Sequence, residues 1–173
     1  ANPMVTTLAY YKRAVEMGVR FFTEAKVASL GLYKGKLRRV ILESGEVFEA
    51  ETVIIAAGYE SRYLARTVGI DVPLFGSDSG LEEEIDMPLT ELKTSSLTVS
   101  AGCRAIMSYI PLLADAKIVR TWGGWIDMCH DGVPVISRVD EVPGMILACG
   151  FTGHGFGTAP TVGLMLAQMA LGE

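Results

Sequence analysis

Apolar side chains recur at helical spacing in several parts of the chain. Residues 5–17 alternate apolar and charged positions in the manner of an amphipathic helix, and Gly18 suits its C-terminal end. Residues 61–68, 89–107 and 161–171 also predict helices. Gly/Pro-punctuated and acidic residues 71–88 are the best candidate domain boundary.

Strand patterns fill most of the remaining chain. Residues 26–32 and 36–42 flank a turn at Lys34-Gly35, a second turn follows at Ser44-Gly45, and together they predict a β-meander. We also expect strands at 20–23, 117–126 and 133–136, with a turn at Asp131-Gly132. The continuous apolar runs 51–57 and 145–149 are typical of buried parallel strands, so the order of elements predicts an α/β fold.

The second buried run leads into Gly150-Phe-Thr-Gly-His-Gly-Phe-Gly-Thr-Ala-Pro160, which has four glycines within eight residues. Pro160 suits a first helical position, which would make Ala159 an N-cap that cannot cap. The first N–H groups would then bond to a ligand or to water, and the pattern alone leaves both open. His154 lies between two glycines, with Phe151 and Phe156 nearby, which favours a ligand contact over a bland loop residue.

Composition excludes several classes of function. A net charge of −5 does not favour nucleic-acid binding, and no apolar run approaches the length of a spanning helix. The three cysteines, Cys103, Cys129 and Cys149, form no CxxC pair, so neither a zinc nor an iron–sulfur site is indicated. Reduced thiols favour a cytoplasmic protein. Two histidines give no Ser/His/Asp spacing typical of a hydrolase.

Four segments, in this order, resemble the D-amino-acid oxidase superfamily of flavoenzymes, which includes glycine and sarcosine oxidases. They are Ala25-Lys26-Val27, Thr52-Val-Ile-Ile-Ala-Ala-Gly58 with Tyr59-Glu-Ser61, Arg120-Thr-Trp122-Gly123 with Asp131-Gly-Val-Pro134, and Leu147-Ala-Cys-Gly150-Phe-Thr-Gly-His-Gly-Phe156. The last motif is highly specific. The pattern fits best the flavin subunits of proline and hydroxyproline dehydrogenases, opine oxidases and hydrogen cyanide synthases.

The resemblance implies an incomplete Rossmann-like FAD-binding domain with a β-meander, plus the remnant of an α+β substrate domain. Residues 1–75 and 121–173 would belong to the FAD-binding domain and residues 76–120 to the remnant. The implied cofactor is FAD, with backbone amides of the glycine loop facing the flavin pyrimidine, and His154 would be catalytic. The implied flavin-binding residues are Val27, Ala56, Ala57, Gly58, Trp122, Gly123, Gly150, Phe151, Thr152, Gly153, His154, Gly155, Phe156 and Gly157.

The chain also departs from the family pattern. The GxGxxG fingerprint is absent, and Phe75-Gly76 leads almost at once into a segment that resembles the end of the substrate-domain sheet. Carboxylate-binding arginines of glycine oxidase-like enzymes are replaced by Ile126 and Gly153, and a lysine of sarcosine oxidase-like enzymes by Gly157. The flavin-linking cysteine of that group falls near Gly124, so Cys129 is not assigned to it.

We therefore expect part of an FAD-dependent oxidoreductase that oxidises the C–N bond of a small amino or imino acid by hydride transfer to flavin. A partner subunit, or further residues of the same polypeptide, would complete the FAD site, and attachment to the inner membrane would occur only through partners. The alternatives are a non-catalytic scaffold subunit that retains the fold and, with less support, a nicotinamide-dependent enzyme.

Overall fold

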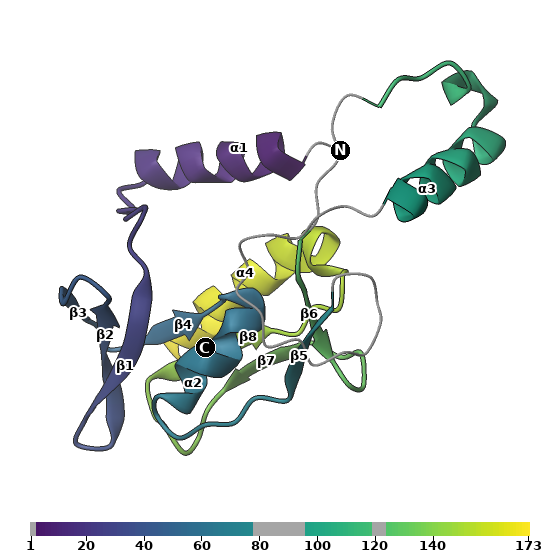
Figure 1. The fold of residues 1–173 in the computed structure, drawn as a ribbon. Helices are drawn as coiled ribbons and strands as arrows, with labels where there is room; N and C mark the ends of the chain where they lie inside the picture. Colours follow the sequence, from purple (N-terminus) through teal and green to yellow (C-terminus); the bar gives the residue numbers. More distant parts are fainter. Residues whose placement is uncertain (1–2, 78–95, 119–123) are drawn as a thin grey trace.

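A computed structural model describes residues 3–77, 96–118 and 124–173. Figure 1 shows the β-strands together in the lower part of the view, with the helices α1 (Pro3–Glu16) and α3 (Ser96–Tyr109) standing away from them. Neither helix contains a buried residue. In the part of the chain that the structure describes, no helix is long and apolar enough to cross a membrane.

The first sheet is the predicted β-meander. Strands β1 (Val27–Tyr33), β2 (Lys36–Leu42) and β3 (Val47–Glu49) follow one another antiparallel, in that order. The turn between β1 and β2 needs two residues with positive φ, and Lys34 and Gly35 adopt +51° and +75°. Gly45 adopts +87° at the second turn. The two predicted turns are therefore confirmed. Each contains a glycine, which takes positive φ angles at little cost.

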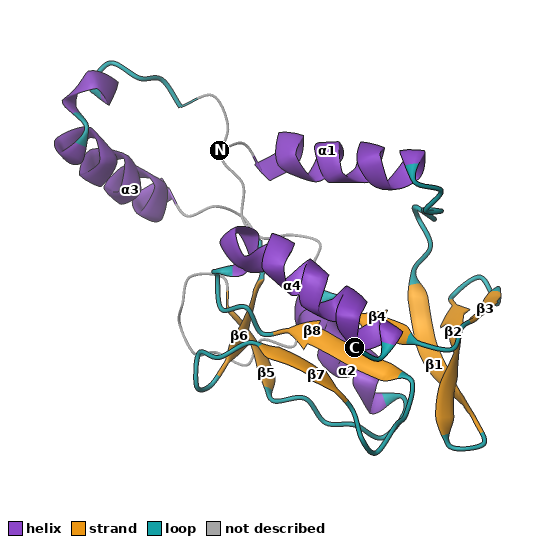
Figure 2. Ribbon diagram, turned by 180° about the vertical axis from the view of Figure 1, so that it is seen from behind, coloured by secondary structure: helices purple, strands orange, loops and turns teal. Residues whose placement is uncertain are grey.

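The second sheet has the strand order β4-β8-β7. Strand β4 (Val53–Ile55) pairs parallel with β8 (Met145–Cys149), with Val53 opposite Met145, while β7 (Val135–Arg138) pairs antiparallel with the other side of β8. All five residues of β8 are buried. Figures 1 and 2, which view the molecule from opposite sides, place α2 (Ser61–Arg66) and α4 (Gly155–Leu171) on opposite faces of this sheet.

A third, two-stranded sheet pairs β5 (Leu74–Ser77) antiparallel with β6 (Ile126–Cys129). Two short 3₁₀ helices, η1 (Gly58–Glu60) and η2 (Pro111–Leu113), complete the described elements. The prediction of a strand over 117–126 was wrong within the described residues, because the strand begins at Ile126 where that range ends; residues 119–123 lie outside the description.

The meander and the central sheet share one core. Its buried residues come from β1, β2, β4, β8 and the segments between them, namely Leu30, Leu37, Ile55, Ala65, Val72, Leu74, Cys129, Val139, Val142, Met145, Leu147 and Cys149. The two sheets meet at Gly144, whose φ is +91° and where a Cβ atom would lie 2.8 Å from the Leu37 carbonyl oxygen. The Val53 amide donates to the Gly144 carbonyl at 2.8 Å, so the absent side chain allows the junction.

The expected strand over 20–23 does not form. These residues are irregular, and the following residue, Glu24, adopts a φ of +57°. Phe22 packs its ring edge-on against Phe48 of β3, with 4.7 Å between the centroids, instead of pairing its backbone. Phe22 is therefore positioned by side-chain packing. A sequence pattern typical of a strand does not distinguish such packing from backbone pairing.

The start of the last helix also differs from the prediction. Helix α4 begins at Gly155 with His154 as N-cap, so Pro160 lies inside the helix and Ala159 is not a cap. Residues 155–159 were expected to precede the helix, because Pro160 suits a first helical position and glycine disfavours helix interiors. Tertiary packing outweighs this preference here, since α4 lies on β8 and β7 and buries Val162. Although His154 stands at the N-cap position, its side chain makes no capping hydrogen bond.

The buried thiol of Cys149 gives the fold a pH dependence. Burial raises its pKa from 9.0 to about 12, helped by Cys129 and the Asp127 charge and opposed by a hydrogen bond with Ser61. Because the folded-state pKa is raised, the stability contribution is complete below about pH 9 and is lost as the pH rises toward 12.

We expect Cys149→Ala to flatten this dependence. Between pH 8 and pH 11, the wild-type free energy of unfolding should fall by on the order of 2 kcal/mol more than that of the variant, because only the wild type must ionise this thiol on unfolding. Denaturant titrations at both pH values measure the difference. Parallel slopes for the two proteins would show that Cys149 does not carry the effect.

Candidate functional site

A cleft of about 480 Å³ opens where β4 and β8 end. Its walls come from the residues after β4, from β6, from the turn after β8 and from one side of α4: Ala56, Gly58, Trp125, Ile126, Asp127, Ala148, Phe151, Gly153, Gly155, Ala159, Val162, Gly163 and Leu166. Seven of these thirteen are glycine or alanine, and Asp127 alone among them is charged. In open α/β sheets, ligands bind outside the carboxyl ends of parallel strands, which is where this cleft lies.

The turn after β8 has an unusual backbone. Gly150, Thr152 and Gly153 adopt φ values of +74°, +51° and +79°. Its end is tied to the helix, since the His154 amide donates to the Phe151 carbonyl at 2.9 Å and Thr158 Oγ1 donates to the His154 carbonyl at 3.2 Å. We call residues 150–154 the glycine turn. It presents Phe151 and Gly153 to the cleft, immediately before the N-terminus of α4.

Strand β6 holds the glycine turn by three hydrogen bonds. The Gly150 amide donates to Asp127 Oδ2 at 2.7 Å, and the Thr152 amide donates to the Asp127 carbonyl at 2.9 Å. The Cys129 amide donates to Thr152 Oγ1 at 3.4 Å. Gly150 itself is buried, and a Cβ atom there would lie 2.3 Å from Cys129 Sγ. The close approach of β6 and the turn thus requires glycine at this position.

An aromatic stack supports the wall formed by Trp125. The Trp125 ring lies 6.4 Å from that of Tyr59, nearly parallel to it, and the Tyr59 ring lies against the guanidinium of buried Arg62 at 5.5 Å. Arg62 is fixed in turn by donating to the Leu74 carbonyl at 2.8 Å. The Trp125 Nε1 atom is buried and has no hydrogen-bond partner among the described residues, so the wall contains an N–H group that a ligand could satisfy.

The structure places only some of the predicted site residues on this cleft. Ala56, Gly58, Phe151, Gly153 and Gly155 line it. The other described ones do not: Val27 lies in β1, Ala57 caps η1 and donates to Ser61 Oγ, Gly150 and Thr152 bond to β6, and His154, Phe156 and Gly157 are exposed around the start of α4. Trp122 and Gly123 lie outside the described residues.

Asp127 was not predicted as a site residue. From the sequence alone, Trp125 could either pack in the core or line a pocket. Trp125 lines the cleft, and its stack on Tyr59 joins residues 66 positions apart in the chain. The bond from Gly150 to Asp127 spans 23 residues. The only signal for Trp125 was its proximity to a second tryptophan across two glycines, while no local pattern marked Asp127.

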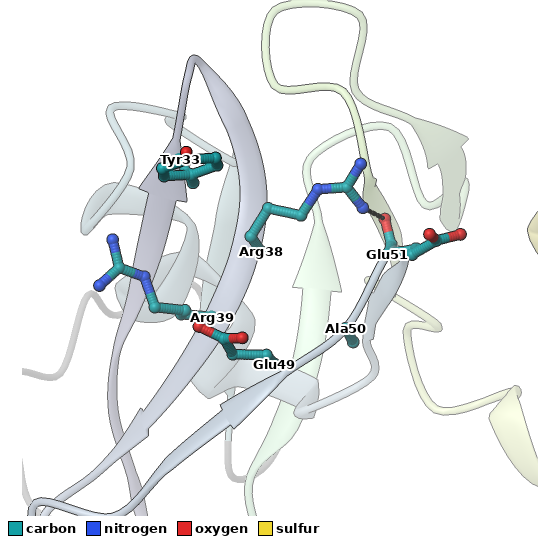
Figure 3. Close-up of a pocket in the computed structure, with 6 residues that line it drawn as sticks. All are labelled: Tyr33, Arg38, Arg39, Glu49, Ala50 and Glu51. Carbon is teal, nitrogen blue, oxygen red and sulfur yellow. Dashed lines mark hydrogen bonds between the residues drawn. The ribbon is translucent and has the colours of Figure 1, made fainter.

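A larger hollow of about 690 Å³ lies on the meander (Figure 3). It is lined by Tyr33, Arg38, Arg39, Glu49, Ala50 and Glu51. Arg38 Nη1 donates to the Glu51 carbonyl at 2.7 Å, and Arg39 lies directly across the strand pair from Glu49. Two cationic and two anionic side chains balance one another, so this hollow lacks the charge excess that would select an ion. The smaller cleft is therefore the candidate functional site.

Comparison with protein-family models gives a match to DAO, FAD dependent oxidoreductase, over residues 1–79 and 75–169. The chain belongs to this family. The resemblance and the Rossmann-like fold class predicted from the motifs are thereby confirmed, as is FAD as the cofactor on which the family depends.

Among curated proteins, sarcosine oxidase subunit beta of Arthrobacter sp is 23% identical over 92% of this chain and 47% of its own length. Glycine oxidase of Bacillus subtilis is 23% identical over 99% of this chain and 54% of its own length. The chain spans about half the length of these relatives.

Solved structures of the family share the fold. The crystal structure of L-proline dehydrogenase from P.horikoshii superposes with a TM-score of 0.81 at 22% identity, over 98% of this chain and 55% of that one. Glycine oxidase from Geobacillus kaustophilus gives a TM-score of 0.75 at 18% identity, over 92% of this chain and 51% of that one. At these identities the likeness establishes the arrangement of helices and strands.

The cleft suits the flat ring of a flavin. Its small side chains leave backbone as the contact surface, and Gly58 and Gly153 have no heavy atom within 4 Å of the place where a Cβ would stand. Trp125 offers a buried N–H group, and a flavin carries ring nitrogens and carbonyl oxygens that accept such bonds. The N-terminus of the 17-residue helix α4 adds a partial positive charge beside the turn.

Proposed function

We propose that this chain is part of an FAD-dependent oxidoreductase that oxidises the C–N bond of a small amino or imino acid. The observation that carries the proposal is the cleft at the ends of parallel strands β4 and β8, bounded by the glycine turn and the start of α4. Relatives named for sarcosine, glycine and D-proline support a small amino or imino acid as substrate.

Bound FAD supplies the acceptor for the hydride that leaves the substrate carbon. The residues of this chain hold and surround the ring. The glycine turn and the N-terminus of α4 would favour negative charge on a ring held against them. Phe151, Val162 and Leu166 give the cleft an apolar lining. Ile126 and Gly153 stand where related enzymes carry arginines, so the substrate carboxylate would be bound by residues elsewhere in the complete protein.

Further polypeptide completes the FAD site in this proposal, either as part of the same chain or as a partner subunit. Strand β4 pairs with β8 alone among the described strands, which leaves its other side open. Helix α1 exposes Met4, Val5, Leu8 and Val15, each at 46% or more. Open apolar surface of this kind is covered in stable proteins. Residues 1–75 and 121–173 contribute to the FAD-binding domain, and residues 76–120 to the remnant of a substrate domain, in a cytoplasmic enzyme.

The test is expression of the complete gene product, with the polypeptide that naturally adjoins or accompanies this chain. We expect a yellow protein with a flavin absorption spectrum that bleaches anaerobically with one of glycine, sarcosine, proline, hydroxyproline or an opine. A correctly folded complete protein without flavin would refute the proposal and favour a scaffold subunit. A flavoprotein that none of these compounds bleaches would refute the substrate class alone.

His154 remains a predicted catalytic residue. It is exposed at the N-cap of α4, beside the cleft wall but not lining it. In the complete enzyme we expect His154→Ala to lower turnover about a hundredfold or more, the usual range for loss of a proton-transferring group, while flavin content falls far less. Steady-state kinetics and flavin absorbance per protein measure both. Unchanged turnover would show that His154 is only a cap residue.

A further inference from the structure

The glycine turn is a backbone conformation that must be held in place. Three of four consecutive residues have positive φ, and one of them, Thr152 at +51°, is β-branched. β-Branched residues avoid this region because Cβ crowds the backbone, so Thr152 adopts this conformation at a cost in free energy. The turn therefore persists only where surrounding contacts fix it.

Asp127 supplies two of those contacts from a single residue. Its carboxylate accepts the Gly150 amide at 2.7 Å, and its carbonyl accepts the Thr152 amide at 2.9 Å. The Thr152 side chain adds a bond within the turn, because its Oγ1 donates to the Gly150 carbonyl at 3.1 Å. Hydrogen bonds to a charged acceptor are the stronger kind, and this one lies in a half-buried position beside an apolar cleft.

We propose that Asp127 is the positioning residue of the cofactor site. Its carboxylate holds Gly150 so that Phe151, Gly153 and the first turn of α4 form one wall of the cleft, and it thereby sets the affinity for flavin. The second half of this statement rests on the proposed function. The first half concerns the turn alone and is measurable without cofactor.

The experiment uses the complete protein and three variants. Asp127→Ala removes the acceptor, Asp127→Asn keeps an oxygen acceptor of nearly the same shape, and Asp131→Ala is the matched control. Asp131 Oδ1 also accepts a backbone amide, that of Val133 at 2.9 Å, but in an exposed turn away from the cleft. Two quantities are measured, namely amide hydrogen exchange of peptides covering residues 150–153 in flavin-free protein, and the Kd for added FAD.

In Asp127→Ala we expect exchange in the glycine turn to be about tenfold to a hundredfold faster, as the loss of a charge-assisted hydrogen bond implies. FAD binding should weaken by at least tenfold. Asp127→Asn should fall between wild type and Asp127→Ala in both measurements, because the oxygen acceptor remains but loses its charge. Asp131→Ala should match wild type in both measurements, although its melting temperature should fall at least as far as that of Asp127→Asn.

Wild-type exchange in Asp127→Ala, faster exchange with unchanged FAD affinity, or an Asn variant as impaired as the Ala variant would each overturn the positioning role. If Asp127→Ala does not fold, Asp127→Asn and Asp131→Ala still test the proposal. A folded Asp127→Asn protein that binds FAD tenfold more weakly than wild type would contradict the expectation that the remaining oxygen acceptor holds the turn. A complete protein that binds no FAD in any form refutes the proposed function and the cofactor half of this proposal, and the exchange measurement then reports on the turn separately.

Discussion

Gly150→Ala is expected to destabilise the complete, flavin-free protein by about 3 kcal/mol. Roughly 1 kcal/mol comes from a side chain at a φ of +74°, and roughly 2 kcal/mol from overpacking, because the new Cβ would lie 2.3 Å from Cys129 Sγ and 3.1 Å from Leu74 Cδ2. This is a large part of the stability of an ordinary domain. Denaturant-induced unfolding followed by circular dichroism measures the change.

Two further variants separate the causes. Gly153 has a similar φ of +79° but no heavy atom near the place of a Cβ, so Gly153→Ala should cost only about 1 kcal/mol. On a Cys129→Ala background, which removes the closest clashing atom, Gly150→Ala should cost about 1–2 kcal/mol less than it does in wild type. If Gly150→Ala and Gly153→Ala prove equally destabilising, the close approach of β6 to the turn is not the reason for glycine at position 150.

Elements with a local cause were predictable from the sequence. The β1–β2 hairpin follows from turn residues that take positive φ, and β8 follows from a continuous apolar run that ends in glycine. The strands of the meander and the two buried strands β4 and β8 were therefore predicted with nearly the right bounds, whereas the pairing of β4 with β8 was not predicted. Neither pattern depends on a distant residue.

Elements decided by distant packing were predicted less well. Phe21 and Phe22 gave a strand pattern, yet the segment has no strand beside it among the described residues, and its rings pack on Tyr11 and Phe48 instead. Helix α4 starts five residues before Pro160, since burial against β8 offsets the poor helix propensity of three glycines and a proline. Tertiary context overrode local preference in both places.

The candidate site divides in the same way. Its backbone half, the glycine turn beside the N-terminus of a helix, was visible because glycine spacing is local. The side chains that hold and support it were not visible. Asp127 acts on a residue 23 positions away, and Arg62 supports Trp125 through Tyr59 by ring contacts. These side-chain contacts depend on which strands become neighbours in the fold, and a single sequence does not reveal that.

Gly155→Val is expected to lower the FAD occupancy of the complete protein by more than tenfold. Gly155 is the first residue of α4 and lines the cleft, and a Cβ atom there would lie 3.2 Å from Phe151 Cβ. The two methyl groups of valine would therefore displace the Phe151 side chain or project into the space where the ring is proposed to bind. Flavin absorbance relative to protein absorbance measures occupancy.

The control is Gly102→Val in helix α3, where no heavy atom lies within 4 Å of the place of a Cβ. It carries the same cost of a β-branched residue in a helix without touching the cleft, so flavin occupancy should match that of wild type. Gly155→Ala should fall between the two, because a single methyl group meets Phe151 without filling the cleft. Full occupancy in a folded Gly155→Val protein would place the flavin elsewhere, since a ring bound against this wall has no room for the added side chain.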